Sequence, residues 1–125
     1  MKYKKLGITN LDVSAICLGT MTYGEQNSQS EAFKMMDYAS EKGINFFDTA
    51  EIYPVYPKKE TTGKSEEIIG SWLKTKKNRD KIIISTKIAS GHPKGVGATG
   101  LKWIRGGKEK LRFDKENMNK AIDGS

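Results

Sequence analysis

The chain has 125 residues, of which 30% are charged and 36% are hydrophobic, and its formal net charge is +7 at pH 7. This length suits one domain with its own core, and no apolar run approaches the roughly 20 residues that a membrane-spanning helix needs. The basic residues are spread along the chain without interleaved aromatic residues, which favours a solvated basic surface over nucleic-acid binding.

Two short elements are predicted near the N-terminus. Residues 3–16, "YKKLGITNLDVSAI", contain two segments around Thr9 and Asn10, with Gly7 beside the turn, and predict a small hairpin. The overlapping apolar run "SAICLG", residues 14–19, ends at a glycine and predicts a short buried strand.

The next segment predicts a helix followed by a second strand. Within residues 28–43, Ser28 and Glu31 have the spacing of a capping box, and Gly43 is a stop signal. Apolar residues recur between them at helical spacing, namely Ala32, Met35, Met36 and Ala39. Residues 44–48, "INFFD", then predict a second buried strand.

A loop with two prolines and Gly63 leads to a second helix, predicted over residues 65–78. The apolar face of this helix consists of Ile68, Ile69, Trp72 and Leu73. Residues 81–88, "KIIISTKI", have a continuous apolar centre, which is typical of strands buried on both faces of a parallel sheet. Strands and helices therefore alternate, which predicts helices packed outside a parallel sheet.

The composition changes after the third strand. Residues 89–112 hold six of the thirteen glycines and several lysines, and they predict a long loop. Residues 113–125 predict the start of a helix with Asp114 as its N-cap. The chain ends about two turns into this helix without the features of a capped end. We therefore expect a truncated chain.

Polar residues follow each of the three predicted strands. Gly19, Thr20 and Met21 follow the first strand, Asp48 and Tyr53 follow the second, and Lys87 ends the third. Each residue alone has an ordinary explanation as a turn, packing or solvated residue. Because ligand sites of parallel α/β folds lie at the C-terminal ends of the strands, the combination predicts a functional site there.

Asp48, Lys87 and Tyr53 suit a general-acid relay for the reduction of a carbonyl group. A phenol, with a pKa near ~10, is a poor proton donor at neutral pH, and a neighbouring ammonium favours the phenolate. A carboxylate beside the lysine keeps the amine charged and positioned. The tyrosine can then supply a proton as the carbonyl oxygen gains negative charge.

Four segments of the chain resemble the aldo-keto reductase family. They are "LGTMTYGEQ" (18–26), "GINFFDTAEIYP" (43–54), "GKSEEIIGSWL" (63–73) and "KIIISTKI" (81–88). The resemblance covers the chain to about residue 88, and again residues 114–125. The loop that follows Tyr53 looks most like that of the bacterial branch of these reductases.

The resemblance implies an α/β fold, the N-terminal part of a TIM (β/α)8 barrel, with a hairpin plug followed by three parallel strands and two to three helices. It also implies an oxidoreductase that reduces aldehydes or ketones with NADP(H), or NAD(H), as cofactor. Tyr53 would be the proton donor, with Asp48 and Lys87 as its partners. The residues beside the cofactor would be Gly19, Thr20, Met21 and Asp48, and no residue is predicted to bind a metal.

The chain also departs from the family pattern. The family's fourth catalytic residue is a histidine after the fourth strand, and the single histidine here, His92, lies in the glycine-rich loop and is not assigned that role. Because a TIM barrel typically needs about 250 residues, we expect this chain to be inactive alone. The alternative is a non-catalytic module that binds a partner, such as a complementary half-barrel, through its open sheet edge.

The N-terminus and the cysteine content indicate the compartment. The first residues contain no apolar core of a signal peptide, and the single cysteine, Cys17, cannot form an internal disulfide. We therefore expect a cytoplasmic protein that acts on a small-molecule carbonyl substrate, without a nucleic-acid or membrane partner. The sequence leaves the identity of the substrate and the oligomeric state open.

Overall fold

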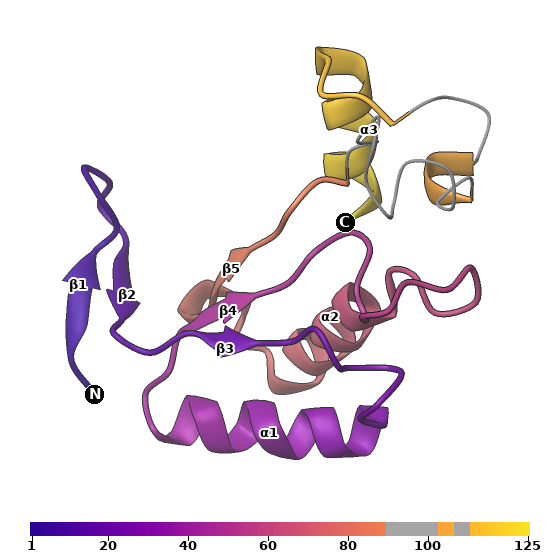
Figure 1. Cartoon of the computed structure of the whole chain (residues 1–125). Coiled ribbons are helices and arrows are strands. Elements are labelled where there is room, and N and C mark those ends of the chain that lie inside the picture. The colour runs from indigo at the N-terminus through magenta and orange to yellow at the C-terminus, as the bar shows by residue number, and fades with distance from the viewer. Residues whose placement is uncertain (90–102, 107–110) are drawn as a thin grey trace.

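A three-stranded parallel sheet forms the centre of the computed structural model, which describes residues 1–89, 103–106 and 111–125 (Figure 1). The strands lie in the order β3 (Leu18–Gly19), β4 (Phe46–Asp48) and β5 (Ile83–Ser85). The predicted parallel sheet is thus confirmed, with strands shorter than expected. The predicted spans 14–19 and 81–88 are too long at their starts. Ser14 pairs within the hairpin, and Lys81 belongs to the 3-10 turn η1 (Arg79–Lys81).

The predicted hairpin consists of β1 (Tyr3–Lys5) and β2 (Asp12–Ser14), which pair antiparallel. Asn45, just before β4, holds it in place. The Asn45 side chain accepts a hydrogen bond from the Ser14 backbone N–H at 2.8 Å and donates one to the Asp12 carbonyl at 2.8 Å. These bonds fix the hairpin at the amino end of β4, opposite the end that carries Asp48.

Helix α1 (Gln29–Glu41) begins at the predicted capping box. The Ser28 hydroxyl accepts a hydrogen bond from the Glu31 N–H at 3.3 Å, and the Glu31 carboxylate accepts one from the Ser28 N–H at 2.8 Å. After the helix, Gly43 adopts a φ of 79°, a left-handed conformation that glycine tolerates best. Helix α2 (Lys64–Lys76) begins one residue earlier than its predicted span.

The core lies between one face of the sheet and the two helices α1 and α2. Phe47 of β4 is fully buried against Trp72 of α2, with ring centroids 5.6 Å apart. Met36 of α1 is also fully buried in this cluster. The Trp72 indole N–H donates to the Asp37 carboxylate at 2.8 Å, which ties the two helices together. Aromatic packing and one directed hydrogen bond therefore fix both helices on the same face of the sheet.

The register determines which side chains face away from the helices. Leu18, Phe47 and Ile84 are paired across the three strands, and all three belong to or pack against the core beneath the helices. Neighbouring residues along a strand point to opposite faces. Asp48 therefore lies on the face that the helices do not cover.

The C-terminal part of the described chain contains η2 (Ile104–Gly106) and α3 (Lys115–Gly124). Asp114 is the N-cap of α3, as predicted, and its carboxylate accepts a hydrogen bond from the Asn117 N–H at 3.0 Å. Most of the predicted loop 89–112, including His92, lies outside the described residues. Among the residues described, no helix is long and apolar enough to span a membrane.

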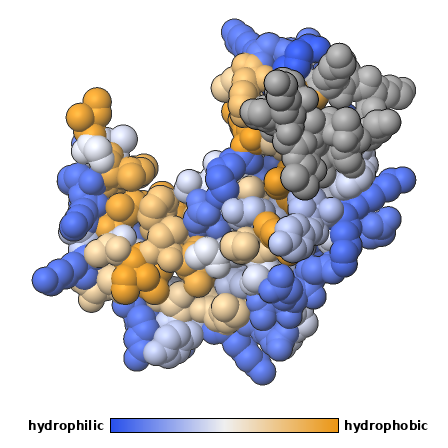
Figure 2. Space-filling model, in the orientation of Figure 1, coloured by the Kyte–Doolittle hydropathy of each residue, from blue (hydrophilic) through white to orange (hydrophobic). Residues whose placement is uncertain are grey.

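The hairpin exposes apolar side chains on the face of the molecule that Figure 2 shows. Leu6, Ile8 and Leu11 surround the hairpin turn, and all three are exposed. The surface around the loop that precedes α2, at the right of the same view, is in contrast mostly hydrophilic. The apolar surface of the hairpin is therefore not buried by the three-stranded sheet.

Substitution of Ser28 by alanine is expected to lower the free energy of unfolding by about 1 kcal/mol, because the first turn of α1 loses the hydroxyl acceptor of its cap. Ser30→Ala is the matched control, since Ser30 lies exposed in the same turn. Urea denaturation followed by circular dichroism measures both variants. Equal destabilisation by the two substitutions would contradict this role of the capping box.

Candidate active site

The carboxyl ends of the three parallel strands meet at one edge of the sheet. Gly19, Asp48 and Ser85 are direct neighbours in the register of β3, β4 and β5. The pairing continues beyond the strands, because the Thr49 N–H donates to the Ser85 carbonyl at 2.8 Å and the Glu51 N–H donates to the Lys87 carbonyl at 3.0 Å. The segments that carry Tyr53 and Lys87 therefore leave the sheet side by side.

Lys87 forms an ion pair with Asp48. Its ammonium lies 2.6 Å from Asp48 Oδ2 and 2.6 Å from the Thr49 carbonyl oxygen, so it bridges a side chain and the backbone that follows β4. Lys87 was predicted at the end of the third strand, whereas β5 ends at Ser85 and Lys87 lies two residues further along the chain. Both side chains of the pair remain partly open to solvent.

Tyr53 lies against the same ammonium. Lys87 Nζ is 4.9 Å from the centroid of the Tyr53 ring, within the range of a cation–π interaction. The backbone fixes Tyr53 on both sides, since its N–H donates to the Ala50 carbonyl at 3.0 Å and its carbonyl accepts from the Gly63 N–H at 2.9 Å. The expected proximity of Asp48, Tyr53 and Lys87 is confirmed, and their catalytic roles stay a prediction.

The surroundings of Lys87 raise its pKa above the usual value. Burial acts to lower this pKa, but the hydrogen bond and the charge of Asp48, with a contribution from Tyr53, outweigh it. The ordinary pKa of a lysine is already near ~10.4, so the amine is charged at neutral pH. The site therefore places a stable positive charge between a carboxylate and a phenol.

The residues after β3 differ in their access to a ligand. Gly19 is exposed, and a methyl group in place of its hydrogen would meet no atom within 4 Å other than those of its chain neighbours. Met21 is also exposed. Thr20, in contrast, is fully buried, and its hydroxyl donates to the Asp48 carbonyl at 2.9 Å. Open space beside Asp48 thus lies at Gly19, its neighbour in the register, while Thr20 holds the backbone of Asp48.

The structure adds residues to which sequence reasoning gave no role. Ser65, at the start of α2, is fully buried, and its hydroxyl donates to the Thr20 carbonyl at 2.8 Å. Glu51 lies between Asp48 and Tyr53 in the chain and pairs with Arg105 of η2 at 2.7 Å. The only available signal for Glu51 was its place in the segment "DTAEIY", and Arg105 lay within a segment interpreted as loop.

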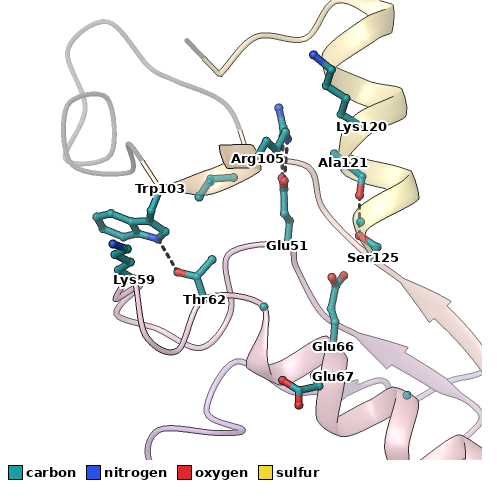
Figure 3. A pocket seen from close by; sticks show the side chains of 14 residues that line it. Glu51, Lys59, Thr62, Glu66, Glu67, Trp103, Arg105, Lys120, Ala121 and Ser125 are labelled. Atoms are coloured by element: carbon teal, nitrogen blue, oxygen red, sulfur yellow. Dashed lines mark hydrogen bonds and ion pairs between the residues drawn. The ribbon is translucent and has the colours of Figure 1, made fainter. Parts of the chain in front are cut away.

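A cleft of about 830 Å³ lies beside this edge, between the first half of α2 and the elements η2 and α3 (Figure 3). Glu66 and Glu67 line it from α2, and Trp103 lines it from the opposite side. Asp48, Tyr53 and Lys87 do not line this cleft. Among the described residues, no group of three or more histidine, cysteine or acidic side chains is arranged to hold a metal ion.

Comparison with known proteins decides the family. The family model of the aldo/keto reductases matches residues 15–125, nearly the whole chain and all of the elements that build the site. The chain belongs to the aldo/keto reductase family. The three parallel strands, the hairpin and the helices are therefore part of the TIM barrel of this family, and no closed barrel is formed by the described residues.

Curated relatives and solved structures agree with this assignment. The protein Tas of Escherichia coli is 39% identical over all 125 residues, and an uncharacterised oxidoreductase of Bacillus subtilis, YrpG, is 43% identical over 89 residues, 70% of this chain and 26% of its own length. The holo form of an aldo-keto reductase from Bacillus halodurans superposes on 99% of the chain, which covers 36% of that structure, with a TM-score of 0.64 and 28% identity. The chain spans 34% of the length of Tas, about a third.

Removal of the Asp48 charge is expected to lower the pKa of Lys87, because the hydrogen bond and the charge of this carboxylate are what raise it. The substitution is Asp48→Asn, and the measurement is an NMR titration of the lysine side chains in the 125-residue chain. The control is Asp12→Asn, which removes the carboxylate paired with Lys5 in the hairpin, at the other end of β4. A Lys87 pKa that is the same in both variants would contradict the pairing.

Proposed function

We propose that the chain supplies the proton-donating side of an NAD(P)H-dependent carbonyl reductase, with Tyr53 as the proton donor. The single observation that carries this proposal is the position of the Lys87 ammonium, which is bonded to Asp48 and lies over the Tyr53 ring. A structural ion pair at a strand end has no need of a phenol at that place. The arrangement matches the requirement of a reaction in which a carbonyl oxygen gains both charge and a proton.

Tyr53, Lys87 and Asp48 have successive roles in the transfer of the proton. As the Tyr53 hydroxyl gives its proton to the carbonyl oxygen, negative charge develops on the phenol oxygen, and the Lys87 ammonium stabilises that charge. Asp48 keeps the ammonium in place through its 2.6 Å hydrogen bond. When bound, the nicotinamide cofactor supplies the hydride that reaches the carbonyl carbon. The products are an alcohol and the oxidised cofactor, and the proton comes from Tyr53.

The edge of the sheet beside Asp48 fits a flat cofactor ring. Gly19 leaves the backbone uncovered there, and Met21, two residues later in the chain, has an exposed apolar side chain. Thr20, with its hydroxyl turned to the Asp48 carbonyl, serves the cofactor site by holding Asp48. NADP(H) is the cofactor that we propose, with NAD(H) as the second choice.

The family and a further relative support a reductase. Norsolorinic acid reductase B of Dothistroma septosporum, by its name a reductase, is 38% identical over 100 residues, 74% of this chain and 24% of that protein. For this chain we propose aldehydes or ketones as the substrate class. The exposed free thiol of Cys17 suits a reducing compartment such as the cytoplasm.

Activity is best tested in a complete barrel. Residues 1–125 are joined to the part of Tas that follows the matched region, because Tas is similar over the whole chain. The fusion is expected to oxidise NADPH in the presence of a reactive aldehyde, whereas the 125-residue chain alone is not. Tyr53→Phe is expected to reduce kcat by roughly a hundred- to ten-thousand-fold, the usual contribution of a general acid.

The matched control for Tyr53→Phe is Tyr56→Phe, which removes the hydroxyl of an exposed tyrosine three residues further along the chain. It is expected to leave kcat unchanged. Binding of NADPH, measured by quenching of protein fluorescence, shows whether each fusion has formed its site. A fusion that binds NADPH and keeps its full kcat after Tyr53→Phe would refute the proposed role of Tyr53.

A further inference from the structure

Of the ion pairs between described residues, the pair of Glu51 and Arg105 is the most buried. The side chains are 13% and 8% exposed, respectively, whereas each of the other ion pairs has at least one side chain more than a third exposed. The contact is bidentate, because Arg105 Nε donates to Glu51 Oε1 and Arg105 Nη2 donates to Glu51 Oε2, both at 2.7 Å. Figure 3 shows the two side chains pointing directly at each other.

Further hydrogen bonds attach this pair to two more segments. Arg105 Nη2 donates to the Ala89 carbonyl at 2.8 Å, and the Ala89 N–H donates to Glu51 Oε2 at 2.8 Å. Arg105 Nη1 donates to the buried Asn117 side chain of α3 at 3.2 Å. The loop after β4, the segment after β5, η2 and α3 are thus joined through two side chains.

Glu51 is attached to the segment of Lys87 through two hydrogen bonds. Its backbone N–H donates to the Lys87 carbonyl at 3.0 Å, and its side chain accepts from the N–H of Ala89, two residues later. Tyr53 follows Glu51 by two residues as well. The backbone segments of Lys87 and Tyr53 are therefore both attached to the residue that carries the buried carboxylate.

Stability alone is a weak explanation for such a pair. Replacement of a buried ion pair by apolar side chains is often neutral or stabilising, because desolvation of the two charges offsets their attraction. Arg105 also adopts a φ of 51°, a left-handed conformation that is unfavourable for a residue other than glycine. What a bidentate guanidinium–carboxylate contact provides is a fixed mutual orientation.

We infer that Glu51 and Arg105 act as a positioning pair, which keeps the segments of Tyr53 and Lys87 in the alignment that proton transfer requires. Neither residue touches the reacting atoms in this role. The inference rests on the proposed function for its catalytic consequence, whereas the alignment itself can be measured without any activity.

The first test uses the 125-residue chain and the variants Glu51→Gln and Arg105→Met. Hydrogen exchange of the Glu51 and Ala89 amides is expected to become faster by roughly a hundredfold, since a broken buried pair opens its surroundings. Amides of α1 and α2 are expected to keep their exchange rates. The control is Glu67→Gln, which removes a carboxylate that lines the same cleft and pairs with Lys64 on the exposed side of α2.

A purely structural role predicts different results. It predicts that exchange becomes faster to the same degree throughout the sheet and both helices, and this result would overturn the inference. So would exchange at Glu51 and Ala89 that equals that of the control. The Lys87 pKa provides a second readout, because it is expected to fall in Glu51→Gln as contact with Asp48 loosens, and to stay unchanged in Glu67→Gln.

The double variant Glu51→Leu with Arg105→Met separates orientation from packing. It is expected to regain only part of the stability that the single variants lose, because no buried charge is left unpaired while the Ala89 backbone and the Asn117 side chain still lack their hydrogen-bond partners, and the Lys87 pKa stays lowered. A double variant that regains both the stability and the Lys87 pKa of the unmodified chain would show that the pair only fills space. In the fusion with Tas, the same double variant is expected to lower kcat at least tenfold with KM for NADPH unchanged.

The two proposals fail in different ways. An inactive fusion that binds NADPH would argue against the proposed function. The hydrogen-exchange and Lys87 pKa measurements would still test the positioning pair. An active fusion whose kcat is unaffected by the double variant would argue against the positioning pair and leave the reductase function standing.

Discussion

The in-register parallel pairing of β3, β4 and β5 is the constraint on which the other features depend. It places Gly19, Asp48 and Ser85 side by side, and the same backbone pairing continues to Glu51 and Lys87. A shift of one residue in β4 would exchange Phe47 and Asp48 between the two faces of the sheet. The aromatic core under the helices and the charged edge of the sheet are therefore two results of one register.

Two kinds of interaction fix the elements around this sheet, namely apolar packing and directed hydrogen bonds. On the helix side, Phe47 and Trp72 hold α1 and α2 through buried aromatic surface. Beyond the strand ends, directed hydrogen bonds take over, from the buried hydroxyls of Thr20 and Ser65 to the paired side chains of Glu51 and Arg105. Apolar packing fixes where the helices lie, and polar contacts fix where the chemical groups point.

Local patterns allowed much of the fold to be predicted from the sequence. The capping box of Ser28 and Glu31 and the N-cap Asp114 are short-range signals, and the helices begin where these signals place them. The strands were predicted in the correct order but too long, because apolar runs do not show where a ladder ends. Ser14, for example, bonds to Asn45 and pairs within the hairpin, a contact between distant residues.

The candidate site was predictable only in part. Asp48, Tyr53 and Lys87 could be found because each follows a strand and because together they resemble a family motif. Glu51 and Arg105 are 54 positions apart, and the sequence around Arg105 has no periodic pattern. The burial of Thr20 could not be foreseen either, since it depends on Ser65 at the start of α2. Long-range contacts of single polar side chains leave little trace in one sequence.

The ion pair of Lys87 also has a consequence for chemical selectivity within the site. A primary amine next to an aldehyde condenses to an imine, and only the free base of the amine can attack the carbonyl carbon. Asp48 raises the pKa of Lys87 and so reduces the fraction of free base. A carbonyl compound bound at this edge of the sheet therefore meets a cation that does not act as a nucleophile, and the lysine is protected from covalent capture by the aldehydes that we propose as substrates.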